Sequence, residues 1–350
     1  GIAFKKALEN SAITLAFNMD ADYFYVGVKA LKEEWPQALN LLTQALTSPA
    51  FPAKAMELVK IQILQAQQVQ TQRVDTLANI LWNKLFFGDH PYGHFHLGTV
   101  ESINSITQAD LQHYLQQHFT QSNIVLSIVG DVNIATLPDE LAAFLHTLPK
   151  QADLPALKPF IPAERGVEQF QTKPFVQSAI AFGMPAVTRH HPDFYALSIL
   201  NYILGGGGLE SRLMKKIREA SGLTYSVHTE LTSLREAGMI KGLVTSDHAT
   251  TQAAIEQVNE VIANLHKTGV TQKEVEAAKQ YLIRSLPLKL DKNEHLAAMV
   301  LQMQLDDLGK DFLERRQNLI SAVTLDAVNR AAKKYLNPVQ LTLMGVGRFE

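Results

Sequence analysis

The sequence predicts an α+β fold made of two homologous domains, each a mixed or antiparallel sheet covered by helices. Three observations lead to this prediction. The chain has 350 residues, 46% of them hydrophobic, which is more than one core usually absorbs. Strand-like segments are followed by runs of long amphipathic helices rather than alternating strictly with them. In addition, one helix–strand pattern occurs twice.

The repeated pattern covers residues 103–132 and 320–349 at one constant offset. It pairs Thr107 with Thr324, Leu126 with Leu343, and Gly130 with Gly347. Each copy predicts a helix with a threonine N-cap, followed by a strand that ends near a glycine. Identity is sparse, so helix–strand alternation alone remains the alternative explanation. The same offset predicts that the first copy lacks its beginning, the counterpart of residues 175–216.

The first domain is placed at residues 1–150. Hydrophobic periodicity predicts strands at 23–30 and 124–129. It predicts helices between them at 37–45, 52–72 and 75–86. Four prolines fall between Pro149 and Pro162, where they oppose a helix and interrupt sheet pairing. We therefore expect an extended linker at residues 151–165.

The second domain is placed at residues 166–350. Alternating polarity predicts strands at 178–184, 224–229, 238–245 and 341–345. A helical period predicts long helices at 253–266, 272–286 and 294–308. A shorter helix is expected at 209–219, after four consecutive glycines.

Composition excludes several classes of protein. With 32 basic and 34 acidic residues, the chain has no charge excess for binding nucleic acid or an anionic membrane. No hydrophobic run approaches the roughly 20 residues that a membrane-spanning helix needs. The absence of cysteine excludes disulfide scaffolds, thiolate zinc sites and cysteine nucleophiles.

Histidines give little support for a metal site. Neither His-Glu-x-x-His nor the inverted His-x-x-Glu-His occurs, so the usual helix-borne zinc protease site is absent. The densest group lies at residues 90–96, but Pro91 and Gly93 indicate a turn with surface imidazoles there rather than a ligand set.

A glycine run and a nearby Arg–Tyr pair are the remaining candidates. The run Gly205, Gly206, Gly207 and Gly208 precedes a predicted helix, yet it lacks the Lys-Ser/Thr of a phosphate loop, which leaves a peptide-contacting loop or a hinge. Taken alone, Arg218 would lie in the last turn of the predicted helix, where a positive charge interacts favourably with the helix dipole, and Tyr225 would begin a strand. Both are ordinary structural roles.

The block 204–227 resembles the second-domain signature of the pitrilysin/insulinase family of zinc metallopeptidases, in its processing-peptidase branch. Residues 87–93, 97–99 and 127–132 support the resemblance. It implies two homologous domains arranged like a clamshell around a chamber, in which zinc in the first domain cuts an unfolded peptide. It further implies that Arg218 and Tyr225, with the glycine run, hold the peptide backbone.

The chain departs from the family pattern at the metal. The resemblance places the zinc-binding glutamate at Gln65 or Ala66, yet residues 58–74 contain no Asp or Glu at all and are rich in glutamine. A neutral amide is a poor substitute for a carboxylate on zinc. The two-histidine motif would fall before Gly1. We therefore expect no metal ligand and no catalytic residue in this chain.

The sequence thus predicts a non-catalytic subunit that supplies peptide binding and half of the chamber, with zinc on a partner. That partner would be a zinc-bearing homologous subunit or a second copy of the chain. Two alternatives stay open: a fragment of a self-sufficient zinc protease whose motif precedes Gly1, and a purely structural core or scaffold subunit. The sequence does not decide the compartment, which stays open between the bacterial periplasm and the cytoplasm.

Overall fold

The computed structural model describes residues 1–224 and 226–349, which form two compact units. Unit one comprises Gly1–Leu64, Thr99–Leu157 and Leu290–Asp307. Unit two comprises Gln65–Gly98, Lys158–Lys289 and Leu308–Glu350. Both contain helices and a sheet, which confirms the α+β class. Their bounds differ from the predicted division, because Gln65–Gly98 packs within unit two and Leu290–Asp307 within unit one.

Unit one contains a two-stranded antiparallel sheet of β1 (Thr14–Met19) and β2 (Phe24–Lys29). Its other elements are helices: α1 (Ile2–Asn10), α2 (Trp35–Thr47), the start of α3 (Ala53–Thr71), α5 (Val100–Ser105), α6 (Gln108–His118), α7 (Leu137–Leu145) and α11 (Asn293–Leu305). Two small clusters form its core, one around Leu41 and one around Leu46 and Phe144.

Unit two contains a five-stranded sheet in the order β3-β7-β4-β6-β5. The strands are β3 (Glu168–Thr172), β4 (Ser178–Pro185), β5 (Ser226–Ser233), β6 (Gly238–Ser246) and β7 (Thr342–Gly347). Only β3 and β7 pair in parallel, and the other neighbours are antiparallel.

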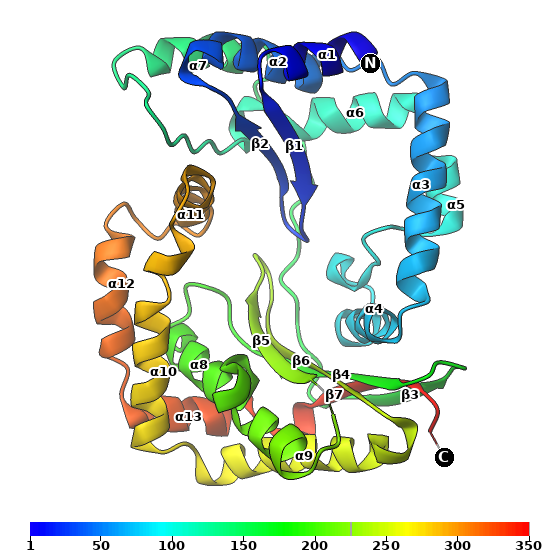
Figure 1. Cartoon of the computed structure of the whole chain (residues 1–350), viewed down its shortest axis with the longest axis vertical. Coiled ribbons are helices and arrows are strands. Elements are labelled where there is room, and N and C mark those ends of the chain that lie inside the picture. Colours follow the sequence, from blue (N-terminus) through cyan, green and yellow to red (C-terminus); the bar gives the residue numbers. More distant parts are fainter. Residues whose placement is uncertain (225, 350) are drawn as a thin grey trace. The chain divides into compact units, whose positions relative to one another are not determined.

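Both faces of this sheet are covered, as Figure 1 shows for α4 (Val74–Phe87) on one side and α8 (Phe194–Asn201), α9 (Thr251–Thr268) and α13 (Leu325–Tyr335) on the other. The central strand β4 is buried along nearly its whole length. Its large side chains, among them Phe182, enter the main core on the α8 side. Gly183 faces α4, where an added Cβ would lie 2.7 Å from the Trp82 ring.

The remaining helices of unit two are α10 (Gln272–Arg284) and α12 (Phe312–Ser321). Two threonine N-caps predicted by the repeat are confirmed, since Thr107 accepts a hydrogen bond from the amide of Asp110 and Thr324 from that of Ala327. In the part of the chain that the structure describes, no helix combines the length and the hydrophobicity needed to cross a membrane.

The predicted strand at 124–129 is wrong. Ile124 has an extended backbone, but the segment makes no ladder with a described strand. Its polar groups turn instead to α11: Ser127 Oγ donates to the carbonyl of Ala297 (2.8 Å), and Gln304 Nε2 donates to that of Leu126 (2.9 Å). The stretch 151–165, expected as a linker, contains no helix or strand.

Candidate functional site

The segment from Tyr202 to Ala220 departs from regular α-helix. Helix α8 continues into a π-helical stretch, Tyr202–Gly206, followed by a 3₁₀ turn, Gly208–Glu210. A second π-helical stretch, Met214–Ala220, then leads toward β5. The helix predicted at 209–219 is therefore replaced by a 3₁₀ turn and a π-helical stretch. Such π-helical geometry is rare, and it frequently occurs at functional sites.

Gly205 is buried against the edge strand β5. A Cβ added at this position would lie 2.6 Å from Thr229 Oγ1 and 2.7 Å from its backbone nitrogen, so only glycine allows this approach. Gly208 has a φ of +59°, which also favours glycine. Gly206 and Gly208 are exposed and Gly207 is half-buried. Part of the run thus has a packing role, whereas its contact with peptide remains a prediction.

Replacing Gly205 with alanine is expected to cost about 1–3 kcal/mol of stability, because the added methyl group must displace the backbone of β5. Gly206→Ala is the matched control: its Cβ would meet chiefly Asn201 Nδ2, the mobile end of a side chain. Denaturant unfolding of the two variants measures the difference. Equal loss of stability in both would contradict the packing role of Gly205.

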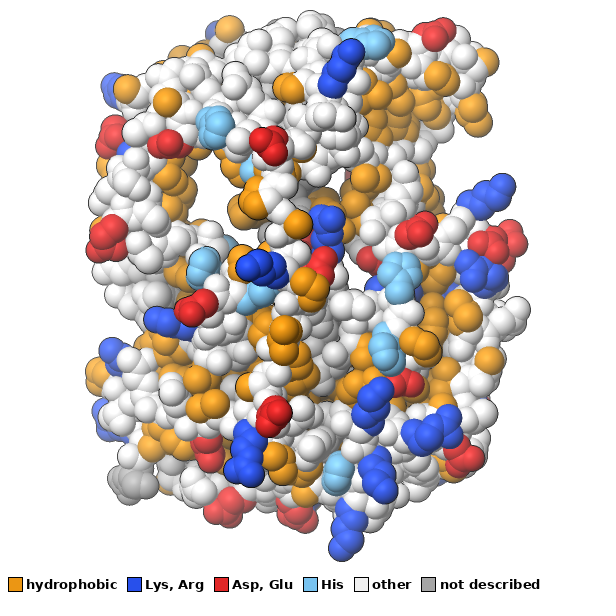
Figure 2. Space-filling view, turned by 180° about the vertical axis from the view of Figure 1, so that it is seen from behind, with side chains coloured by type: hydrophobic (Ala, Val, Ile, Leu, Met, Phe, Trp, Pro, Cys, Tyr) orange, Lys and Arg blue, Asp and Glu red, His pale blue; other side chains and the backbone are white. Residues whose placement is uncertain are grey.

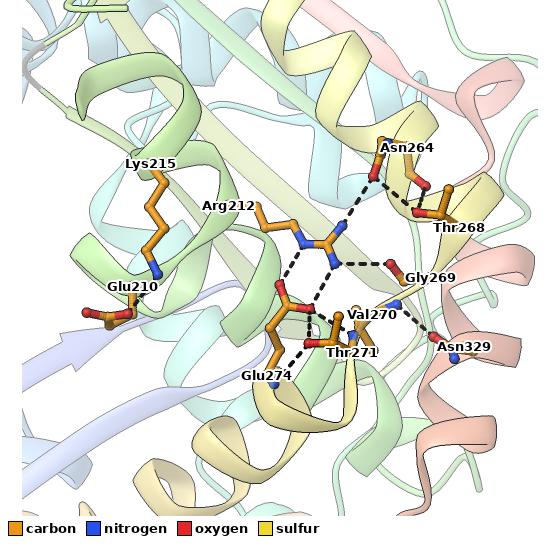
Figure 3. Close-up of polar contacts among 10 residues, drawn as sticks. All are labelled: Glu210, Arg212, Lys215, Asn264, Thr268, Gly269, Val270, Thr271, Glu274 and Asn329. Atoms are coloured by element: carbon orange, nitrogen blue, oxygen red, sulfur yellow. Dashed lines mark hydrogen bonds and ion pairs between the residues drawn. The ribbon is translucent and has the colours of Figure 1, made fainter. Parts of the chain in front are cut away.

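Arg218 lies on the second π-helical stretch with its side chain exposed. Among the described residues, no hydrogen bond or ion pair is made by its guanidinium, while the other three basic residues of 211–220 are all paired. These pairs are Arg212 with Glu274 (2.7 Å), Lys215 with Glu210 (2.7 Å) and Lys216 with Glu260 (3.1 Å), the first two shown in Figure 3. Tyr225, its predicted companion, lies outside the described residues.

The predicted zinc-glutamate position lies on α3, where Gln65 and Ala66 are both exposed. Neither side chain carries a charge, and no carboxylate occurs on this helix after Glu57. Within residues 1–224 and 226–349, no three His, Asp or Glu side chains are grouped to hold a metal ion. The residues at this position therefore do not fit zinc.

The histidine group near residue 90 forms a turn, as its Pro and Gly indicated. His90 Nε2 lies 2.9 Å from the carbonyl of Lys158, and its Nδ1 accepts a hydrogen bond from the amide of Tyr92 (3.3 Å). Both ring nitrogens are thus used within the turn, which also packs against Phe160.

Two groups of residues were missed from sequence. Arg212, which is close to Arg218 in the chain, forms an ion pair with Glu274 through two hydrogen bonds. The sequence contained one sign of it, the Thr271-x-x-Glu274 pattern that predicts a capping box. Lys241 is a largely buried cation of β6 whose Nζ donates to Asn83 Oδ1 (2.7 Å). Burial lowers its pKa to about 8, although Glu230 on the neighbouring strand opposes that shift.

The face shown in Figure 2 agrees with the nearly balanced composition. On it, basic and acidic side chains lie interspersed with exposed hydrophobic ones. A face mixed in this way does not generate the strong single-sign field that nucleic-acid binding requires.

Three comparisons connect this architecture to known proteins. Residues 105–282 match the family described as "Peptidase M16 inactive domain". The chain is 29% identical over 290 residues to "Non-peptidase homolog YmxG" of Helicobacter pylori, covering 82% of this chain and 66% of that relative. It thus spans just under two thirds of the length of that relative.

A second relative is the "Uncharacterized zinc protease YmxG" of Bacillus subtilis, 26% identical over 314 residues and matched over 89% of this chain and 76% of its own length. Among solved structures, the peptidase M16 inactive domain from Pseudomonas fluorescens superposes with a TM-score of 0.92. That structure is 27% identical, and the match covers 99% of this chain and 84% of the other.

Proposed function

The chain belongs to the family of peptidase M16 inactive domains, and on that premise we propose that it is a non-catalytic subunit that holds an unfolded peptide for a zinc-bearing partner. It would supply Arg218, Tyr225, the glycine run and half of the chamber wall. The partner would supply the metal and the cleavage chemistry. No step of bond cleavage is assigned to this chain.

One observation carries the proposal: the guanidinium of the exposed Arg218 makes no hydrogen bond or ion pair with a described residue, on a segment whose other cations are all paired. A guanidinium offers five hydrogen-bond donors in a fixed planar geometry. It can therefore hold backbone carbonyl groups of an extended peptide without selecting a side chain, which suits binding of unfolded substrates.

The position of Gln65 and Ala66 argues for a heteromeric partner. A second copy of this chain would carry the same two neutral side chains where the family places a carboxylate. Pairing with itself would thus repeat the deficit rather than correct it. A homologous subunit that keeps the metal-binding residues would complement it.

Arg218→Ala is expected to lower kcat/KM of the reconstituted complex for an unfolded peptide by about ten- to a hundredfold, the usual effect of losing hydrogen bonds from a charged group. Arg218→Lys should retain only part of the activity, because an ammonium cannot reproduce the planar fork. Lys215→Ala is the matched control, since Lys215 is exposed on the same segment but paired with Glu210.

The same assay separates the alternatives. Cleavage by the purified chain alone, stopped by a chelator, would show a self-sufficient protease and overturn the proposal. A complex that needs the chain but is indifferent to Arg218→Ala would identify a scaffold subunit instead.

A further inference from the structure

The guanidinium of Arg212 joins the start of the Arg218 segment to two other helices. Its Nε and Nη2 donate to the two carboxylate oxygens of Glu274 at 2.7 and 2.9 Å, as drawn in Figure 3. Nη1 donates to Asn264 Oδ1 (3.3 Å), and Nη2 also donates to the carbonyl of Gly269 (3.1 Å). A bidentate pair of this kind fixes direction as well as distance.

Glu274 is itself held in place. The backbone nitrogen and the hydroxyl of Thr271 both donate to its Oε2 at 2.8 Å, which forms the capping box of α10. The amide of Val270 donates to Asn329 Oδ1 on α13 (2.8 Å). Burial raises the pKa of Glu274, but the hydrogen bonds from Arg212 and Thr271 outweigh it and lower that pKa to about 2. The carboxylate therefore remains ionised.

The stretch Met214–Ala220 is long for a π-helix, since π-helical geometry is rare and occurs mostly as single turns inside α-helices, so contacts at its ends help to hold it. At its far end, Ser221 Oγ donates to the carbonyl of Lys216 (3.0 Å) and accepts from Gln257 Nε2 (2.8 Å). Arg218 lies between these two fixed ends. The pairs of Lys215 and Lys216 are more exposed, and exposed pairs restrain a backbone weakly.

We propose that Arg212 and Glu274 are positioning residues for Arg218: their ion pair sets the register of the π-helical stretch so that the guanidinium of Arg218 faces a bound peptide. This inference rests on the proposed function of Arg218. Neither residue is expected to touch the peptide. Their effect on binding must then pass entirely through Arg218.

A double-mutant cycle on the full chain tests this. Binding of a fluorescein-labelled peptide that is unstructured in solution is measured by anisotropy for Arg212→Ala, Arg218→Ala and the double variant. Arg212→Ala should weaken binding about tenfold, as expected for a displaced binding group. In the Arg218→Ala background it should change binding less than about twofold. Additive losses would overturn the inference.

Hydrogen exchange of the amides in residues 214–220 provides a readout that does not depend on peptide binding. Exchange there should rise in Arg212→Ala and stay unchanged in Arg218→Ala. Glu274→Gln separates the two roles of Glu274, because glutamine can still cap α10 but cannot form the ion pair. It should also raise exchange in 214–220, while the Lys216→Ala control should not.

Peptide binding and hydrogen exchange together distinguish failure of the proposed function of Arg218 from failure of the positioning role of Arg212 and Glu274. If the wild-type chain fails to bind the peptide, or if Arg218→Ala binds normally, the proposed function of Arg218 is contradicted. Unchanged exchange in Arg212→Ala would contradict the positioning role even when Arg218 proves important.

Discussion

Replacing Trp82 with alanine should destabilise unit two by about 3–5 kcal/mol, the usual cost of removing a large aromatic side chain from a core. Trp82 is fully buried and stacks on Phe86 with ring centroids 4.5 Å apart. Its Nε1 also donates to the carbonyl of Thr342 (2.9 Å), which the variant would leave without this partner. Gly183 cannot fill the space from the opposite side, because it has no side chain.

The other tryptophan supplies the control. Trp35 is only partly buried in unit one, where its Nε1 donates to the exposed Glu140 (Oε2, 2.7 Å), so Trp35→Ala should cost less. Urea unfolding followed by circular dichroism compares the two variants. A midpoint that moves no further for Trp82→Ala than for Trp35→Ala would show that α4 does not anchor the sheet.

The second large effect concerns Lys241 and pH. Burial lowers the pKa of Lys241 from 10.5 to about 8, while the unfolded chain keeps the ordinary value. Below pH 8 both states carry the proton, and folding must bury a charge. Between about 8 and 10.5 the unfolded state binds more protons, so the free energy of unfolding should rise with pH. The full rise is about 3 kcal/mol.

Lys241→Met removes this contribution but keeps the hydrophobic length of the side chain. The free energy of unfolding of the wild type, minus that of the variant, should therefore increase as the pH is raised through this range. Subtracting the variant's free energy of unfolding cancels the contributions of tyrosines and other lysines, which titrate alike in both proteins. Parallel curves for the two proteins would show that Lys241 titrates normally and that its site beside Trp82 is open to water.

Sequence periodicity predicted the long helices and most of the C-terminal sheet because those elements have one clear buried face. Helix α9 has seven buried residues at helical spacing, and it was predicted within two residues at each end. The strand at 124–129 failed for the opposite reason. Its alternating pattern is intact, but pairing depends on a neighbouring strand, and a pattern within one segment does not specify its neighbour.

The candidate site was predictable in part. Arg218 and the glycine run came from a local motif, and the missing carboxylate from a gap in composition around Gln65. The ion pair between Arg212 and Glu274 was not predictable, because the two residues are 62 positions apart in sequence. The burial of Lys241 depends likewise on Asn83, which is 158 residues away.

The contact between Trp82 and Thr342 also bears on how the chain is made. The two residues are 260 positions apart, and β7 comes after the other four strands of its sheet in chain order. At about 5–20 residues per second, translation leaves α4 without this partner for on the order of 10–50 s. During that interval α4 can pack on β4 but not yet on β7. Docking of α4 on the complete sheet therefore has to wait until β7 has left the ribosome.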